Sequence, residues 1–130
     1  MKLLLPFHLH KVGAGFPSPA TDYVEDDIDL NVHLIKNIPS TFLIRVQGKS
    51  MNIIGIHDDD LLVVDRSLNP KNFSTVIANV NEELVVKNFV KEKNQSFLTS
   101  GSKKLKDKIN LIENPEICIW GVVTYVIHAL

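Results

Sequence analysis

The feature that most constrains the fold is a change in the spacing of apolar residues at Pro39. Before this proline, apolar residues in 30–35 recur at the spacing of a helix, and Asp29 is suited to cap its N-terminus. After it, residues 41–47 follow a period of two, which is typical of a half-buried strand. The sequence therefore predicts a short helix and then a strand that ends at Gly48.

The rest of the chain continues in short runs that are typical of strands. Residues 61–64 are all apolar, as in a strand buried on both faces. Residues 74–80 and 82–90 predict a hairpin joined near Asn81. Further strands are predicted at 95–99, 109–112 and 117–129. We expect one mainly β domain over residues 29–130 and an N-terminal arm over 1–28.

Composition narrows the class of protein. The chain has 130 residues, of which 45% are hydrophobic and 22% charged, so a globular domain is expected rather than a disordered one. A net charge of -1 provides no field for holding nucleic acid, so any DNA contact should run mainly through partners. No apolar run reaches the roughly 18 residues of a membrane helix.

The single cysteine, Cys118, excludes an internal disulfide and favours a reducing compartment. We therefore expect a cytoplasmic protein. Because Cys118 stands in an apolar run, it is predicted to fill the core.

The arm is predicted to be extended and mobile. Residues 1–20 hold three of the six prolines and two of the six glycines, and residues 21–29 are strongly acidic. Neither stretch has a helix or strand pattern. The small residues Ala14 and Gly15 leave the backbone between them easily reached by a peptidase.

Ser50 and Lys87 form a candidate catalytic pair. A serine hydroxyl needs a base to become a nucleophile, and lysine is a base only when neutral, which requires burial because its ordinary pKa is about 10.4. Strand geometry places Lys87 on one face with Val85 and Phe89, among apolar neighbours. The alternatives are an ordinary turn serine at Ser50 and a Lys87 side chain that bends out to water.

The remaining motifs do not support a further functional site. Residues 48–50 do not end a phosphate-binding loop, because Leu43 stands where that motif needs glycine. Residues 58–60 resemble half a calcium loop without its later glutamate, and the lysines of 103–108 are expected on a solvated loop. No metal or other cofactor is expected, since no single element carries a ligand-spaced set of the histidines His8, His10, His33, His57 and His128.

Taken together, the motifs of the chain carry a family resemblance. They occur in order at residues 15–25, 28–31, 48–51, 55–56, 60–65, 85–87 and 120–123. In their order and spacing they resemble the UmuD-type members of the LexA-like serine-lysine peptidases. The resemblance runs from about Gly15 to the C-terminus.

The resemblance implies a LexA-like catalytic domain of strongly bent antiparallel sheets, with a short N-terminal helix and a mobile arm. It implies that Ser50 attacks the carbonyl of Ala14, that Lys87 is the general base, and that the Ala14-Gly15 bond breaks. Backbone N–H groups of Lys49 and Ser50 would stabilise the oxyanion.

The resemblance also implies partners. Cleavage is expected on contact with RecA filaments on single-stranded DNA, as part of the SOS response to DNA damage. The trimmed homodimer would then serve a UmuC-like, Y-family catalytic subunit in error-prone translesion synthesis.

Three other classes of protein compete with this interpretation. A LexA-like repressor needs a helix-turn-helix domain before the cleavage bond, and only fourteen residues precede Gly15. A leader peptidase with the same catalytic pair is expected to have a membrane anchor, and no apolar run in this sequence is long enough for one. A binding-only accessory module, in which Ser50 and Lys87 are idle, stays open.

Two positions depart from the family's pattern. Asp59 stands where glycine is usual, and because aspartate tolerates a left-handed backbone better than most residues, that conformation is predicted here. Lys49 stands where relatives often carry an acidic or small residue, which adds a positive charge next to Ser50.

Overall fold

The computed structural model describes residues 4–8, 24–48, 54–100 and 108–130, and the chain divides into two compact units, Met1–Lys36 and Asn37–Leu130. The boundary predicted after residue 28, between arm and peptidase domain, stays a prediction. Among the described residues, no helix is long and apolar enough to cross a membrane.

The first unit holds a strand pair and a helix. Strand β1 (Leu4–His8) pairs antiparallel with β2 (Val24–Asp29), and helix α1 (Leu30–Leu34) follows directly. The Asp29 side chain accepts a hydrogen bond of 3.0 Å from the backbone N–H of Asn31, which confirms the predicted N-cap. The two strands were not predicted. Backbone pairing satisfies N–H and C=O groups whatever the side-chain pattern, so strands can form where no alternation is present.

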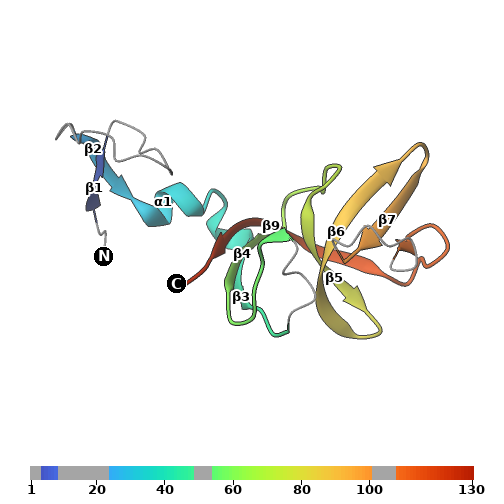
Figure 1. Ribbon diagram of the computed structural model, residues 1–130. Coiled ribbons are helices and arrows are strands. Elements are labelled where there is room, and N and C mark those ends of the chain that lie inside the picture. Colours follow the sequence, from blue (N-terminus) through green and yellow to red (C-terminus); the bar gives the residue numbers. More distant parts are fainter. Residues whose placement is uncertain (1–3, 9–23, 49–53, 101–107) are drawn as a thin grey trace, which may run out of the picture. The chain divides into compact units, whose positions relative to one another are not determined.

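The second unit is built on one antiparallel sheet of seven strands, in the order β3-β4-β9-β5-β6-β7-β8 (Figure 1). A short 3-10 helix, η1 (Ile38–Ser40), leads into it. Its strands are β3 (Thr41–Arg45), β4 (Leu61–Asp65), β5 (Thr75–Val80), β6 (Glu83–Glu92), β7 (Gln95–Thr99), β8 (Ile109–Asn110) and β9 (Cys118–Ile127). The mainly β fold class is thereby confirmed.

Irregularities in β9 bend this sheet. The register of β9 shifts against β4 between Val63 and Val64, and against β5 between Ile77 and Ala78. Such bulges bend the strand and increase its twist. Gly121 of β9 has no room for a side chain, because an added Cβ would lie 2.6 Å from a methyl carbon of Val64.

The central strand β5 is buried on both faces. Ile77 joins one apolar cluster with Val46, Ile56, Leu62 and Val64. The residues on either side of it point the other way, into a cluster made by Val76, Ala78, Phe89, Leu98 and Val122. Residues beside β5 are therefore held by core packing on two sides.

Most predicted strands are confirmed, with small changes at their ends. The predicted hairpin is β5-β6, and its turn residues Asn81 and Glu82 both have positive φ, as a tight right-twisted hairpin requires. The prediction for Cys118 is wrong, because its thiol is exposed. Cys118 opens β9 opposite the exposed Asn79, on the side of the strand that faces solvent.

Candidate active site

A cavity of about 400 Å³ lies between the end of β3 and the start of β6. Residues 44–48 form one wall, residues 83–87 form the other, and Ile77 of β5 contributes between them. The cavity therefore brings Gly48, close in sequence to Ser50, together with Lys87.

Lys87 occupies a half-buried position in the middle of β6. Its cross-strand partner on β5 is Val76, which is fully buried, and Val85 and Phe89 on the same face pack in the second core cluster. The predicted apolar neighbours are thus present. The side chain of Lys87 forms no hydrogen bond or ion pair with another described residue, in contrast to that of Lys108, whose Nζ lies 3.1 Å from Glu92.

One edge of the β6 wall is not paired by any strand of the described residues. Residues 83–87 pair with β5 on one side, whereas β7 pairs with β6 only from Asn88 to Glu92. Over residues 83–87, no described strand pairs with the other edge. An unpaired strand edge presents N–H and C=O groups that can take up an extended peptide.

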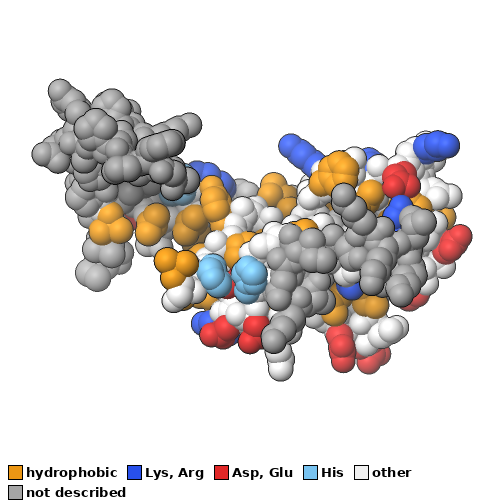
Figure 2. Space-filling view, viewed as in Figure 1, with side chains coloured by type: hydrophobic (Ala, Val, Ile, Leu, Met, Phe, Trp, Pro, Cys, Tyr) orange, Lys and Arg blue, Asp and Glu red, His pale blue; other side chains and the backbone are white. Residues whose placement is uncertain are grey.

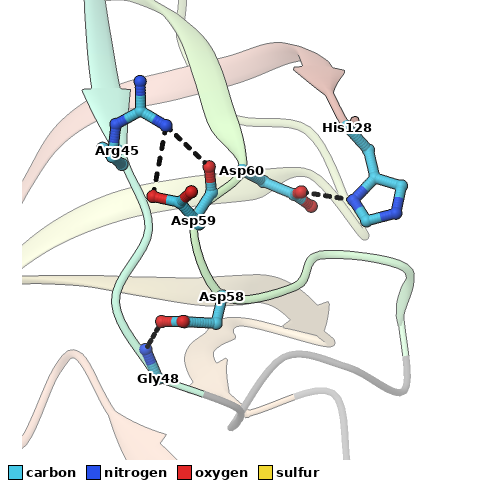
Figure 3. Close-up of polar contacts among 6 residues, drawn as sticks. All are labelled: Arg45, Gly48, Asp58, Asp59, Asp60 and His128. Atoms are coloured by element: carbon cyan, nitrogen blue, oxygen red, sulfur yellow. Dashed lines mark hydrogen bonds and ion pairs between the residues drawn. The ribbon is translucent and has the colours of Figure 1, made fainter. Parts of the chain in front are cut away.

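The opposite wall is attached to the acidic turn, residues 57–60. Gly48, with φ of 104°, donates its backbone N–H to the Asp58 carboxylate at 2.8 Å (Figure 3). This left-handed conformation favours glycine at the position. Ser50, Lys49, Ala14 and Gly15, which the sequence assigned to nucleophile, oxyanion site and cleavage bond, lie outside the described residues.

Two further residues of this wall are bonded to the same turn. The N–H of Val46 donates to the carbonyl of Asp60, and the N–H of Asp59 donates to the carbonyl of Val46, each at 2.8 Å. Arg45 Nη1 lies 2.9 Å from the Asp59 carbonyl and 3.2 Å from its carboxylate. Asp59 has φ of 71°, which confirms the predicted left-handed conformation.

A buried carboxylate anchors the acidic turn. Asp60, 2% exposed, accepts the backbone N–H of His57 at 2.8 Å and lies 2.5 Å from Nδ1 of His128. The His57 hydrogen bond, followed by the His128 contact, holds the pKa of Asp60 below its ordinary value. The rings of His57 and His128 are 5.1 Å apart, and Figure 2 shows a histidine pair with acidic side chains beside it.

Sequence reasoning missed this anchor. His128 and Asp60 are 68 residues apart, and no spacing rule connects them. Only the adjacency of β4 and β9 brings them together. No described group of side chains could hold a metal ion.

A second buried carboxylate fixes the start of β3. Asp65 accepts hydrogen bonds from Asn37 Nδ2 at 2.8 Å, from Ser40 Oγ at 2.9 Å, and from both the N–H and hydroxyl of Ser67. These bonds, that from Asn37 foremost, hold the pKa of Asp65 far below its ordinary value. The chain is thereby held in place just before it forms the β3 wall.

The bent antiparallel sheet and its cavity belong to a known class of protein. Residues 6–124 match the family described as Peptidase S24-like, and the chain belongs to this family. Among its relatives, ImpA of Salmonella typhimurium is 42% identical over 123 residues, which cover 95% of this chain and 83% of ImpA. MucA of Escherichia coli is 36% identical over 121 residues, covering 93% of this chain and 82% of MucA.

A LexA repressor of Clostridium novyi is 31% identical over 113 residues, which cover 87% of this chain and 54% of the repressor. The resemblance to UmuD-type, LexA-like peptidases is confirmed by these matches. Family membership supports a serine peptidase of the LexA-like type.

Proposed function

We propose that the chain is a self-cleaving peptidase of the SOS response that uses Ser50 and Lys87 to cut its own Ala14-Gly15 bond. The observation that carries the proposal is the cavity lined by both Gly48 and Lys87. Ser50 follows Gly48 by two residues, a span of at most about 7 Å. A serine hydroxyl near a half-buried lysine is the arrangement that a serine-lysine peptidase needs, and a cavity that Gly48 and Lys87 both line supports it.

The reaction follows from the chemistry of the pair. Ser50 Oγ attacks the carbonyl carbon of Ala14 while the neutral amine of Lys87 takes the hydroxyl proton. Backbone N–H groups at Lys49 and Ser50 stabilise the resulting oxyanion. The bond to Gly15 then breaks, its amine leaves with a proton, and water hydrolyses the ester on Ser50.

The edge of β6 that no described strand pairs with suits an extended substrate, such as the chain's own arm. Residues 83–87 can accept an extended segment through backbone hydrogen bonds, and such a segment would pass Lys87. The residues around the proposed bond include Ala14, Gly15 and Pro17, which do not favour a helix. An extended arm therefore suits this edge.

The proposed partners follow the resemblance. A RecA filament on single-stranded DNA would trigger cleavage, and the trimmed homodimer would serve as accessory subunit of a UmuC-like, Y-family DNA polymerase in the cytoplasm. The net charge of -1 supports a role in which partners supply most DNA contacts. The second candidate is a binding-only accessory module, in which the pair does no chemistry.

The intact mass of the purified chain tests the proposal. One sample is incubated with RecA, single-stranded DNA and a slowly hydrolysed ATP analogue, and another is held at alkaline pH, where lysine loses its proton without help from a partner. Loss of residues 1–14 is expected in both. A folded chain that stays whole in both would support the binding-only module instead.

Matched variants identify the catalytic pair. Ser50→Ala and Lys87→Ala should abolish cleavage and leave the fold intact, because the first removes a single hydroxyl group and Lys87 is only half-buried. Lys91→Ala is the control, since Lys91 lies on β6 four residues further on and outside the cavity lining. Cleavage of the Ser50 or Lys87 variant at the Ala14-Gly15 bond would contradict the assignment.

A further inference from the structure

The contact between Asp58 and Gly48 is the last described attachment of the chain before Ser50. The Asp58 carboxylate accepts the backbone N–H of Gly48 at 2.8 Å (Figure 3). A charged acceptor makes this bond stronger than a neutral one. Since Gly48 lines the cavity with Lys87, the bond fixes one end of the segment that carries Ser50 at the cavity wall.

The turn that carries Asp58 is anchored by contacts that do not involve the Asp58 side chain. Asp60 is buried and bonded to His57 and His128, and the backbone around Asp59 is bonded to Val46. These contacts remain when the Asp58 side chain is changed, because none of them uses it. Asp58 itself is exposed, so its carboxylate contributes little to the core.

The attachment at Gly48 differs in kind from the one at Val46. Val46 is held by backbone hydrogen bonds that continue the pairing of β3 with β4. Gly48 is bonded to the turn through a side chain, and its left-handed φ of 104° turns the chain away from the strand direction. Among the described contacts, the backbone N–H of Gly48 is therefore held by the side chain of one residue, Asp58.

We propose that Asp58 is a positioning residue for self-cleavage: by holding the Gly48 backbone, it sets where the Ser50 segment begins relative to Lys87. This inference rests on the proposed function. A misplacement of about 1 Å between reacting groups can slow a reaction by up to about a hundredfold. Removal of the Asp58 carboxylate should therefore slow cleavage without unfolding the sheet.

The experiment follows self-cleavage of the full chain at a series of alkaline pH values, by intact mass. Asp58→Ala is expected to lower the rate by about tenfold to a hundredfold. Asp58→Asn should give an intermediate rate, because the amide oxygen still accepts from Gly48 but without the charge. Asp59→Asn is the matched control: it removes a neighbouring charge, tolerates the left-handed backbone, and should be cut at nearly the wild-type rate.

The pH profile separates positioning from other roles. Asp58→Ala should lower the rate by the same factor at every pH and leave the midpoint of the profile in place, with an unchanged unfolding temperature. The inference is overturned if Asp58→Ala is cut at the wild-type rate, if Asp59→Asn is slowed equally, or if the lost activity follows a lowered unfolding temperature. A wild-type chain that is never cut, or a Ser50→Ala chain that is, would overturn the proposed function together with this inference.

Discussion

The two walls of the cavity are held by different interactions. Residues 83–87 are fixed by their register on β5, whose side chains fill the core on both faces. Residues 44–48 end an edge strand and are attached through hydrogen bonds to the acidic turn, several from exposed groups. The wall that carries Lys87 is thus held by the centre of the sheet, whereas the wall that leads to Ser50 adds polar contacts with the turn to the pairing of β3 and the packing of Val46.

The largest effect is expected from a substitution in the core that packs beneath the β6 wall. Ile77 is 1% exposed, pairs with Val86 of β6 and lines the cavity. Ile77→Ala should reduce the free energy of unfolding by about 2–5 kcal/mol, through lost burial and the void left behind. Denaturant unfolding followed by circular dichroism measures this loss. Leu84→Ala is the control, because Leu84 lines the same cavity but is 50% exposed and should cost well under half as much.

A smaller effect is expected where polar bonds hold the start of β3. Asp65→Asn keeps the shape of the side chain but removes its charge and opposes an amide N–H to the Asn37 donor. The expected loss is about 2 kcal/mol at neutral pH, typical of hydrogen bonds to a charged group. Calorimetric unfolding measures it. A loss as large as that of Ile77→Ala would show that the polar attachment matters as much as the core.

The pH dependence of stability provides a second test of the role of Asp65. Because the folded-state pKa of Asp65 lies far below 3.8, its ordinary value, its contribution is complete above that pH. As pH falls below about 3.8, the unfolded chain takes up a proton before the folded one, and the contribution is lost. The Asp65→Asn variant should lose less stability than the wild type over this acidic range. Equal acid sensitivity of the two proteins would contradict the assignment.

The smallest effect is expected at the exposed ion pair of the acidic turn. The side chains of Arg45 and Asp59 are 57% and 78% exposed, so water screens their attraction. Arg45→Ala should change the free energy of unfolding by no more than about 0.5 kcal/mol. Chemical denaturation measures it. A change above 1 kcal/mol would mean that the β3 wall depends on this side chain far more than its exposure indicates.

The sequence predicts the strands well because their spacing is a local property. The alternation in 41–47 and the apolar run at 61–64 each allow one pattern of burial, and β3 and β4 form there. The left-handed turn at Asp59 is likewise local. Lys87 was placed correctly among apolar neighbours because strand geometry alone fixes its face.

Features that depend on contacts between segments far apart in the sequence could not be predicted from local spacing. The contact of His128 with Asp60 exists because β9 lies beside β4. The bond of Asp58 to Gly48 requires the chain to return after ten residues with a particular turn. The exposure of Cys118 depends on where β9 begins on its neighbour β5, which an apolar run does not specify. The assignments of Ser50, Lys49 and the Ala14-Gly15 bond stay predictions.

The surroundings of Trp120, the only tryptophan of the chain, have a practical consequence. Its ring lies 5.2 Å from that of Phe42 on the edge strand β3, and the guanidinium carbon of Arg66 lies 4.4 Å from its centre. Indole emission responds to the polarity and charge around the ring. The protein therefore carries its own optical reporter for the attachment of β3, and detachment of this strand can be followed by fluorescence without any added label.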